Sequence, residues 1–406
     1  MRVLLLSQWF DPEPTVKGLN FARGLVEQGF EVDVVTGFPN YPGGEVYPGY
    51  RIRLYQIERE HRLRVIRLPL YPSHNRSKIG RVFNYSSFML AAMLFLLCSR
   101  RKHDVAYVYH PPLTVGMIAF MLRTLRGVPY VYDVQDLWPH TLKATGMVSN
   151  ASILTAVEWV VRKVYARASV ITVLSHGFKR EIAKSGVPEG KILVIHNWAD
   201  EERLGKTPGL PQDDDLQGHY FNLLFAGTMG AAQNTEIIIE AVAIATSNCR
   251  RLRLVLMGGG IEREMLQRKS IAMGLANVVF LPALEMDRIG PIHRWADALI
   301  LHLRDDPLFK ITIPSKLQTY LYFGRPIIIA VNGDAADIVR EAQCGIVCHP
   351  GSAQEIAEAI ERLYALGAEQ LACMGARARR HYERVFSSKQ GIAQFCEALV
   401  KARVQV

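Results

Sequence analysis

The sequence predicts an α/β protein of two domains, each built on a parallel sheet with helices on both faces. Three observations support this fold class. The chain has 406 residues, which is too long for one ordinary hydrophobic core. Short, almost continuously apolar segments alternate with helical patterns in both halves, as expected for parallel strands that are buried on both faces. Between the two series, residues 201–220 carry two prolines, three glycines and an acidic run, so we predict a linker there.

The first domain is expected over residues 1–200. Its predicted strands are Val3–Ser7, Val32–Thr36, Val65–Leu68, Val105–Tyr109, Tyr130–Asp133, Val170–Leu174 and Ile192–Ile195. Apolar residues at helical spacing predict helices between most of these strands, including Leu19–Gln28, Leu113–Leu125 and Ile153–Ala168. Helical crossovers of this kind connect parallel strands, whereas tight hairpin loops connect antiparallel ones.

The second domain is expected over residues 221–385, where the same alternation begins again. Its predicted strands are Leu223–Ala226, Leu254–Met257, Val278–Leu281, Leu299–Leu303, Ile327–Ala330 and Gly345–Cys348. After His349 the pattern is helical to the end of the chain, and residues 386–406 are expected to form a separate last helix.

Composition favours a protein of a reducing compartment. Hydrophobic residues make up 49% of the chain, which is enough for a core in each domain. The six cysteines are scattered, form no CxxC pair and have no zinc-site spacing with histidine, so we predict free thiols and no metal site. The apolar segment Val3–Leu6 is too short for the core of a signal peptide, so we expect a cytoplasmic location.

The net charge of +10 is concentrated in one segment of the first half. Residues 51–102 contain 12 Lys and Arg against 2 Asp and Glu, so this segment holds the whole excess. It also contains the apolar run Phe88–Cys98, which is shorter than the ~20 residues that span a bilayer. We therefore predict that this run lies in the membrane interface, or alternatively that it is a core helix beside a solvated basic face. The basic residues expected to face anionic lipid are Arg76, Lys78, Arg81, Arg100, Arg101 and Lys102. A basic surface can also bind nucleic acid, but no nucleic-acid motif accompanies it, and we expect no such partner.

The segment Phe309–Ala330 reads as a loop, a helix and a buried strand. Pro314 suits the start of a helix, Ser315 can cap it, and Gly324 is expected to end it. Lys316 stands at the helix N-terminus, where free N–H groups and the helix dipole attract anions. The pattern favours a diphosphate ligand, although an ordinary αβ unit with a surface lysine has the same appearance.

Other candidate residues follow the predicted strands, because ligands of open α/β sheets bind beyond the carboxyl ends of the strands. After the first strand, a loop containing Thr15, Lys17 and Gly18 can let a phosphate or a sugar approach the backbone. In the second domain, Gly227 and Thr228 follow one strand and the triplet Gly258, Gly259 and Gly260 follows the next. A single glycine triplet is often only a tight turn, whereas two glycine loops in one domain favour nucleotide binding.

These motifs together resemble glycosyltransferase family 4, whose members have the GT-B fold of two Rossmann-like domains facing a central cleft. The resemblance covers nearly the whole chain and rests on these segments: RVLLLSQWFDPEPTVKGLNFARGLVEQGFEVDVVTGFPNYPGG, YVYHPPLTVG, PYVYDVQDLWP, SVITVLSHGFKREIAKSGVPEGKILVIHNWAD, LLFAGTMG and FKITIPSKLQTYLYFGRPIIIA. Within the family, the chain is most similar to bacterial O-antigen and capsule transferases of N-acetyl-L-fucosamine. The resemblance also implies that the last helix returns to the N-terminal domain.

The resemblance implies that Lys316 stabilises the departing diphosphate, with the helix start at Pro314 and Ser315 assisting. Arg304, after another strand, is a further candidate for donor binding. The family usually carries an Arg and a Lys after the Gly227 loop, and this chain has neither. It also carries two glutamates eight positions apart, where this chain has Ile311 and Thr319. Ribose binding is therefore expected to use Gln318, Thr319 or a residue outside the motif.

Two residues of the first domain are candidates near the reacting sugar. Many relatives have a histidine where this chain has Gln135, and Asp136 follows it. Asp136 can orient the acceptor, or it can cap the next turn. His110 can hydrogen-bond a sugar, or it can pack before Pro111. Trp138 can stack on a sugar, or it can be a core residue.

The resemblance implies a retaining transferase that uses a UDP-sugar donor and needs neither a metal, a cofactor nor a protein nucleophile. The expected acceptor is a sugar on a polyprenyl diphosphate at the inner face of the cytoplasmic membrane, to which the protein would bind peripherally. Two alternatives remain open from the sequence: a UDP-sugar 2-epimerase of the same architecture, and a catalytically silent membrane-bound scaffold. The sequence leaves the oligomeric state open.

Overall fold

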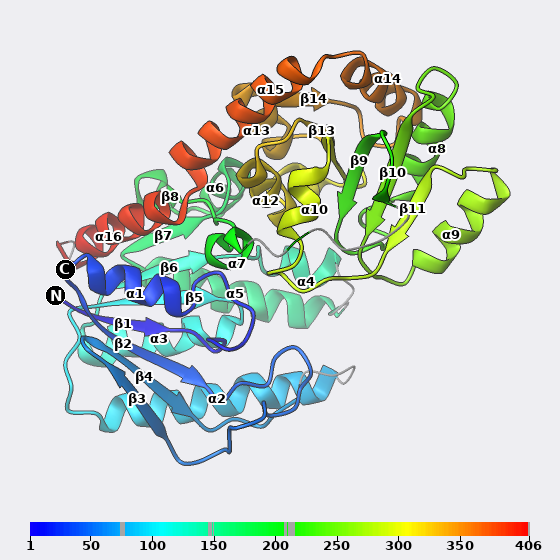
Figure 1. Ribbon diagram of the computed structural model, residues 1–406. Coiled ribbons are helices and arrows are strands. Elements are labelled where there is room, and N and C mark those ends of the chain that lie inside the picture. Colours follow the sequence, from blue (N-terminus) through cyan, green and yellow to red (C-terminus); the bar gives the residue numbers. More distant parts are fainter. Residues whose placement is uncertain (74–77, 145–147, 149, 207–208, 210–215, 405–406) are drawn as a thin grey trace. The chain divides into compact units, whose positions relative to one another are not determined.

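The computed structural model describes residues 1–73, 78–144, 148, 150–206, 209 and 216–404. The chain forms two compact units, which are drawn in Figure 1. The first unit comprises Met1–His196 together with Gly391–Val406, and the second comprises Asn197–Gln390. Each unit is an α/β domain of the GT-B type, with a central sheet between layers of helices.

The sheet of the first unit has eight strands in the order β3-β4-β2-β1-β5-β6-β7-β8. The strands are β1 (Arg2–Leu6), β2 (Glu31–Gly37), β3 (Gln56–Glu60), β4 (Leu63–Leu68), β5 (Val105–His110), β6 (Tyr130–Val134), β7 (Val170–Val173) and β8 (Ile192–Val194). All neighbours are parallel except the pair β3 and β4. The parallel strands are almost fully buried, which explains their continuous apolar sequences.

Strand β3 is absent from the sequence prediction, and its chemistry explains why. Its sequence QIERE is mostly polar, and it lies at the edge of the sheet, paired antiparallel with β4. Across this pair Glu58 accepts a hydrogen bond from Arg67 (2.9 Å). Edge strands that are half exposed carry polar residues, so a search for apolar runs overlooks them.

Helices cover both faces of the first sheet (Figure 1). The helices are α1 (Leu19–Glu27), α2 (Lys78–Cys98), α3 (Leu113–Arg126), α4 (His140–Ala144), α5 (Ala151–Arg167), α6 (His176–Lys184), the 3-10 turn η1 (Glu189–Lys191) and α16 (Ser388–Val404). Helix α3 packs between α2 and α5. Helix α16 packs beside α1 through the rings of Phe21 and Phe395, whose centroids lie 5.4 Å apart. The C-terminal helix therefore belongs to the first unit.

The sheet of the second unit has six parallel strands in the order β11-β10-β9-β12-β13-β14. These strands are β9 (Phe221–Ala226), β10 (Leu252–Met257), β11 (Val278–Leu281), β12 (Ala298–His302), β13 (Ile327–Ala330) and β14 (Gly345–Val347). Its helices are α7 (Glu201–Gly205), α8 (Glu236–Ala245), α9 (Arg263–Ala272), α10 (Gly290–Trp295), α11 (Pro307–Lys310), α12 (Ser315–Phe323), α13 (Asp334–Ala342), α14 (Ala353–Tyr364), α15 (Ala368–His381) and the π-turn η3 (Tyr382–Phe386).

The second unit has one hydrophobic core on each face of its sheet. Alternate residues of β9 point to opposite faces, so Leu224 joins the core beneath α10, α12 and α13, whereas Leu223 joins the core beneath α8 and α14. Both leucines are fully buried. The two cores hold the carboxyl ends of β9, β10 and β12 in fixed positions.

The first part of the predicted linker is a structured portion of the second unit. Glu201 begins α7, and its carboxylate accepts hydrogen bonds from the Tyr382 hydroxyl (2.7 Å) and from the backbone N–H of Ser388 (2.8 Å). The unit boundaries accordingly lie after residues 196 and 390, rather than at 200 and 386. The acidic run 213–215 of the predicted linker lies outside the described residues.

Strand order places a topological switch point in each unit. In the first sheet β1 has β2 on one side and β5 on the other, and in the second sheet β9 has β10 on one side and β12 on the other. Ligands of open α/β sheets bind beyond the carboxyl ends of the strands at such points. The loops after β1 and β5, and those after β9 and β12, are therefore the segments that position a ligand in each unit.

Helix α2 corrects the prediction that the apolar run is too short to cross a membrane. The helix begins ten residues before Phe88, and its portion Ile79–Cys98 is long and apolar enough to span a bilayer by length and composition. One face of α2 packs on the unit, where Phe88, Ala92 and Leu96 are buried. The helix is thus both a packed element of the domain and apolar on the face that points away from it.

Candidate functional site

Lys316 lies in the first turn of α12, at the carboxyl ends of β9 and β12. Pro314 is the N-cap residue, and Ser315 is the first helical residue rather than the cap that the sequence suggested. Pro314 makes no side-chain capping bond, and the Leu317 N–H donates to the Pro314 carbonyl (2.9 Å), so the N–H groups of Ser315 and Lys316 are the ones left for a ligand. Gly324 ends the helix in the left-handed conformation, as predicted.

The ammonium of Lys316 is buried without a hydrogen-bond partner. Among the residues that the structure describes, none pairs with its Nζ atom, which lies 3.8 Å above the centre of the Phe225 ring. Burial lowers the pKa of Lys316 to about 7. An aromatic face stabilises a cation only in part, so this buried group still lacks an anion. The arrangement suits a ligand that brings a negative charge.

Gly227 provides the space that the Lys316 side chain occupies. A Cβ atom on Gly227 would overlap Lys316 Cε and would lie 2.8 Å from its Nζ. The φ angle of Gly227 is also positive, at 136°. The glycine loop after β9 and the lysine of α12 therefore pack directly against each other. A larger residue at position 227 would displace the ammonium of Lys316.

The two glycine loops of the second unit lie against each other. Met229 N–H donates to the Gly259 carbonyl (2.7 Å), and a Cβ atom on Gly258 or Gly260 would overlap the backbone of residues 227–229. Gly258 and Gly260 thus serve loop-to-loop packing rather than the approach of a ligand. Gly259 has open space beside its Cα atom, so it is the member of the triplet beside which a ligand has room.

Of the two residues predicted to bind ribose, one is turned inward. Gln318 is buried, and its amide nitrogen donates to the carbonyl oxygens of Pro314 and Ser315 (2.9 Å each). It therefore supports the start of α12. Thr319 is half-buried, and its hydroxyl donates to the Ser315 carbonyl at 3.3 Å, which leaves a weakly held hydroxyl near the same helix end.

The segment where the family usually has an Arg and a Lys is held through two of its backbone carbonyls, those of Ala232 and Gln233. His302, in β12, donates from Nδ1 to the Gln233 carbonyl (2.8 Å), and its Nε2 accepts from the Gly351 N–H (3.2 Å). Burial lowers the pKa of His302, which keeps the ring neutral in this role. The Arg304 N–H donates to the Ala232 carbonyl (3.0 Å), while the Arg304 side chain is exposed, as is Thr228.

In the first unit, the chain's own carboxylate stands where the sequence predicted an incoming phosphate. Asp11 Oδ2 accepts a hydrogen bond from the N–H of Leu19, the first residue of α1. A Cβ atom on Gly18 would overlap this carboxylate. Gly18 therefore makes room for Asp11 at the helix N-terminus, and the half-buried Thr15 lies against the same glycine.

Lys17 points into the interior of the first unit. Its side chain is fully buried, with Nζ 4.8 Å above the Phe395 ring of α16. Burial lowers its pKa to about 7, and the nearby charge of Asp133 opposes that shift. Asp133 in turn accepts hydrogen bonds from Tyr107 (2.6 Å) and Thr172 (2.8 Å). In this structure the Lys17 ammonium stabilises a buried polar cluster and does not face solvent.

His110 is the last residue of β5, and Asp136 lies two residues after the end of the neighbouring strand β6. The His110 and Trp138 rings lie 5.3 Å apart, edge to face. Burial lowers the pKa of His110 to about 3, so the ring is neutral at physiological pH. The Asp136 carboxylate is half-buried, has no hydrogen-bond partner among the described residues, and has a pKa that burial raises. The Asp136 carboxylate is available to hydrogen-bond a sugar hydroxyl, and the Nδ1 atom of His110 is buried without a hydrogen-bond partner among the described residues.

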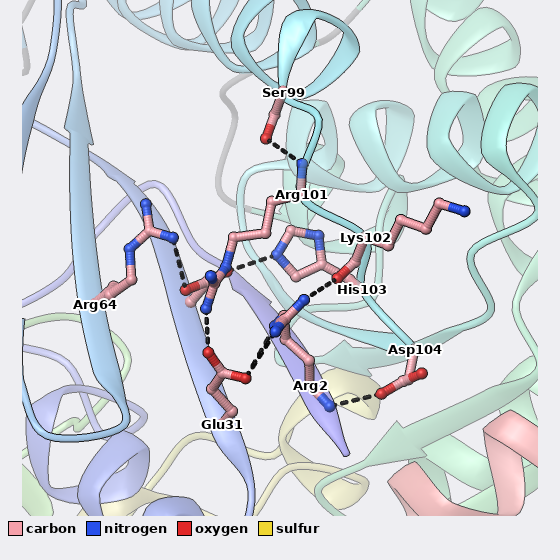
Figure 2. Close-up of polar contacts among 9 residues, drawn as sticks. Arg2, Glu31, Arg64, Ser99, Arg101, Lys102, His103 and Asp104 are labelled. Carbon is pink, nitrogen blue, oxygen red and sulfur yellow. Dashed lines mark hydrogen bonds and ion pairs between the residues drawn. The ribbon is translucent and has the colours of Figure 1, made fainter.

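The basic residues predicted to face lipid differ in their surroundings. Arg101 reaches the carboxylate of Glu31, at the amino end of β2 (Figure 2), and it also pairs with the carboxylate of Asp33. Burial would raise the pKa of Asp33, but hydrogen bonds from His103 and Arg101 outweigh it and lower the pKa. Arg101 is therefore a half-buried cation that pairs with the chain's own carboxylates, whereas Arg100 and Lys102 are exposed. Arg81 is half-buried, and Arg76 and the Lys78 side chain lie outside the described residues.

Three functional side chains escaped the sequence reasoning: Phe225 beneath Lys316, Asp11 at α1, and His302 behind the Gln233 segment. Phe225 and His302 read as ordinary members of apolar strands. Asp11 belongs to the motif DPEP and was visible, because an acidic residue shortly before a helix is a candidate for its N-terminus.

Structural comparison agrees with the fold described above. The crystal structure of Anabaena Alr3699/HepE in complex with UDP and glucose superposes with a TM-score of 0.64 at 16% identity, over 98% of this chain and 99% of that one. The fold is therefore GT-B. Among related sequences is WcaI of Escherichia coli strain K12, whose name describes a colanic acid biosynthesis glycosyl transferase. It is 26% identical over 97% of this chain and 98% of its own length. An alpha-D-kanosaminyltransferase of Streptomyces kanamyceticus is 22% identical over 84% of this chain and 88% of its own.

The two domain families that match this chain identify the class of protein: it is a glycosyltransferase with the GT-B fold. Family comparison makes the assignment more particular. Residues 16–198 match the glycosyl transferase 4-like domain, and residues 220–365 match the glycosyl transferases group 1 domain. One glycosyltransferase domain thus matches each half of the chain, in agreement with the family resemblance predicted from the sequence.

Proposed function

We propose that the protein transfers a sugar from a UDP-sugar donor to a sugar carried by a polyprenyl diphosphate, with retention of configuration and without a metal. The unpaired cation of Lys316 carries this proposal. Departure of a nucleoside diphosphate builds negative charge, and a preorganised cation in a partly dry site stabilises that charge. The open N–H groups of α12 add a partial positive charge at the same place.

The second unit is proposed to hold UDP and the first unit the acceptor. The structure of Anabaena HepE with UDP supports UDP as the nucleotide. In the front-side route, the acceptor hydroxyl attacks the anomeric carbon as the carbon–oxygen bond to UDP breaks. The leaving phosphate oxygen takes the hydroxyl proton, so no protein nucleophile is needed. Asp136 and neutral His110 orient the acceptor through hydrogen bonds.

The proposed sugar is an amino sugar, with N-acetyl-L-fucosamine as the best candidate, for O-antigen or capsule repeat units. The names of the colanic acid transferase and of the kanosaminyltransferase support a surface polysaccharide and an amino sugar respectively. Thermal stabilisation by a panel of UDP-sugars tests the donor. A larger shift with an N-acetylated deoxysugar than with UDP-glucose is expected, and equal shifts would contradict the amino-sugar proposal.

UDP release tests the reaction itself. Lys316→Ala is expected to lower turnover by about 100-fold or more, the cost of removing a group that stabilises the leaving charge. Lys310→Ala is the matched control, because Lys310 lies nearby in the sequence but pairs with Asp305 (3.0 Å) and is 45% exposed. Unchanged turnover in Lys316→Ala, or turnover that EDTA abolishes, would contradict the proposed mechanism.

The protein is also proposed to bind the inner face of the cytoplasmic membrane through the outward face of α2. Six large apolar side chains form a stripe along that face, about 27 Å long at 1.5 Å per residue. Their exposed fractions are Ile79 71%, Val82 62%, Phe83 61%, Leu90 57%, Leu94 65% and Leu97 39%. Exposed apolar patches of this size are typical of interaction surfaces.

Neighbouring residues extend this surface. Leu54 is 82% exposed and Tyr55 53%, and the Tyr55 ring lies 6.4 Å from that of Phe95 in α2. The exposed basic residues Arg100 and Lys102 follow the helix. A helix with an apolar outward face and basic neighbours lies in the interface of an anionic bilayer, where each cation adds ~1 kcal/mol.

Sedimentation with vesicles of anionic phospholipid tests this surface. Leu90→Glu combined with Leu94→Glu is expected to weaken vesicle binding by at least about tenfold, since each leucine loses ~1.5–3 kcal/mol of apolar burial. Ile271→Glu, at a residue of α9 that is 78% exposed, is the control and is expected to bind as the unaltered protein does. Equal binding by all three proteins would contradict the proposal.

A further inference from the structure

An apolar cavity of about 450 Å³ that is open to solvent lies in the first unit, among α2, α3, α5 and the segments after β5 and β6. Hydrocarbon and aromatic groups form most of its wall, including those of Leu113, Met117, Trp138, Val157 and Val160. No charged residue is among the lining residues in the described part of the chain.

This apolar lining is unfavourable for the sugar and diphosphate groups of the proposed substrates. The lining offers the hydroxyls of Tyr85, Thr114 and Ser152 but no charged group, so a diphosphate that entered the cavity would lose its hydration without meeting a cation, which is costly. A branched hydrocarbon makes no hydrogen bonds to water, so it loses none when it enters the cavity. The occupant that fits this wall is therefore an apolar chain.

The cavity adjoins the proposed acceptor residues. Pro112, in its wall, is two residues after His110, and Trp138 is two residues after Asp136. The rings of His110 and Trp138 are in edge-to-face contact at 5.3 Å. A molecule whose sugar lies beside His110 and Asp136 can extend an attached apolar chain toward the cavity.

The cavity also meets the outward face of α2. Tyr85 lines the cavity, and Val82, three residues earlier on the same helix, belongs to the exposed apolar stripe. Residues three apart on a helix are neighbours on its surface. An apolar chain can therefore pass from the stripe to the cavity along the surface of one helix.

From this continuity we infer that the cavity binds the first isoprene units of the acceptor's polyprenyl chain, next to its diphosphate. The inference rests on the proposed function, because it takes the acceptor to be an isoprenoid. It adds that the enzyme recognises the chain itself and holds the lipid-linked sugar at a fixed distance from the reacting centre.

Photo-cross-linking tests the cavity without requiring transfer. The probe is a farnesyl diphosphate analogue with a diazirine on its chain, and labelled peptides are located by mass spectrometry. Labelling is expected in the α5 residues that line the cavity or at Trp138. An excess of farnesyl phosphate is expected to compete, whereas dodecyl phosphate is expected to compete at least tenfold less well.

Matched variants separate the cavity from the rest of the protein. Val157→Asp places a charge in the wall and is expected to lower labelling by at least tenfold. Val400→Asp makes the same change at a residue of α16 that is 49% exposed, and it is expected to leave labelling intact. Ala156→Phe fills the cavity without adding charge and is expected to reduce labelling as well.

The outcomes distinguish this inference from the proposed transferase reaction. Lys316→Ala is expected to lower UDP release by about 100-fold or more but to retain full labelling, because Lys316 lies in the other unit. Equal labelling of Val157→Asp and Val400→Asp, labelling at other peptides, or equal competition by dodecyl phosphate would overturn the inference. Absence of UDP turnover in the unaltered protein would overturn the proposed function while the labelling result stands by itself.

Discussion

Binding of UDP should depend on pH through a single group, Lys316. Its ammonium is buried over Phe225 without an anionic partner, and its pKa is about 7 in the free protein. A bound diphosphate supplies the missing negative charge and holds the lysine protonated, so binding above pH 7 requires uptake of a proton. The affinity for UDP should therefore be greatest below pH 7 and should fall as the pH rises.

The magnitude follows from the fraction of protein that carries the charge. With a pKa of about 7, roughly half of the lysines are protonated at pH 7 and about one in ten at pH 8. Relative to its value at low pH, the dissociation constant should be about twofold higher at pH 7 and about tenfold higher at pH 8. It should rise about a further tenfold between pH 8 and pH 9. Each tenfold step corresponds to about 1.4 kcal/mol.

Isothermal titration calorimetry in buffers of different ionisation enthalpy measures both the affinity and the proton uptake. Uptake should grow from about 0.5 proton at pH 7 to about 0.9 at pH 8. Lys316→Met separates this effect from titration of the nucleotide, since the variant should bind weakly and any pH dependence that it keeps belongs to the nucleotide. A flat profile in the unaltered protein, or a profile that Lys316→Met shares, would refute the reasoning.

Three further predictions concern residues around the candidate sites of the two units. Gly258→Ala should lower the free energy of unfolding by about 1–3 kcal/mol or more because its Cβ meets the opposite loop, while Gly259→Ala should stay within about 0.5 kcal/mol, as urea titrations can measure. Asp11→Ala should cost about 1 kcal/mol and lower the melting temperature, since α1 loses the acceptor at its N-terminus, and an unchanged melting temperature would contradict that role. His302→Phe should cost about 1–3 kcal/mol and weaken UDP binding, because the Gln233 carbonyl loses its donor; a loss of stability with unchanged binding would limit the histidine to a structural role.

Much of the scaffold was predictable from the sequence because parallel strands are buried on both faces. Strands such as β5 and β13 are continuous apolar runs, and their predicted bounds agree with the structure to within one residue. The edge strand β3 was not predictable in this way, because half of its surface is exposed and its residues are polar. The length of α2 was also missed, since its first turns mix basic and apolar residues.

The candidate site divides along similar lines. Lys316 could be found because a helix start leaves a local signature of proline, serine and a following strand. Its partner Phe225 lies far away in the sequence, and only the pairing of strands in the sheet brings the two together. Gly18 was recognised as a position where the backbone must be approached closely. Which group approaches, a substrate phosphate or the carboxylate of Asp11, depends on a loop conformation that composition does not determine.

The opposite treatment of the two helix N-termini has a consequence for how the enzyme sorts its substrates. In both units a helix begins after a strand at the switch point of the sheet, and a helix N-terminus at this point can bind a phosphate. The N-terminal unit fills that position with a built-in anion, Asp11, whereas the C-terminal unit leaves it open beside a bare cation, Lys316. A phosphate group is therefore expected to be repelled at the helix start of the first unit and attracted at that of the second unit. Two domains of one architecture can in this way differ in their affinity for an anion through a single carboxylate of the chain itself.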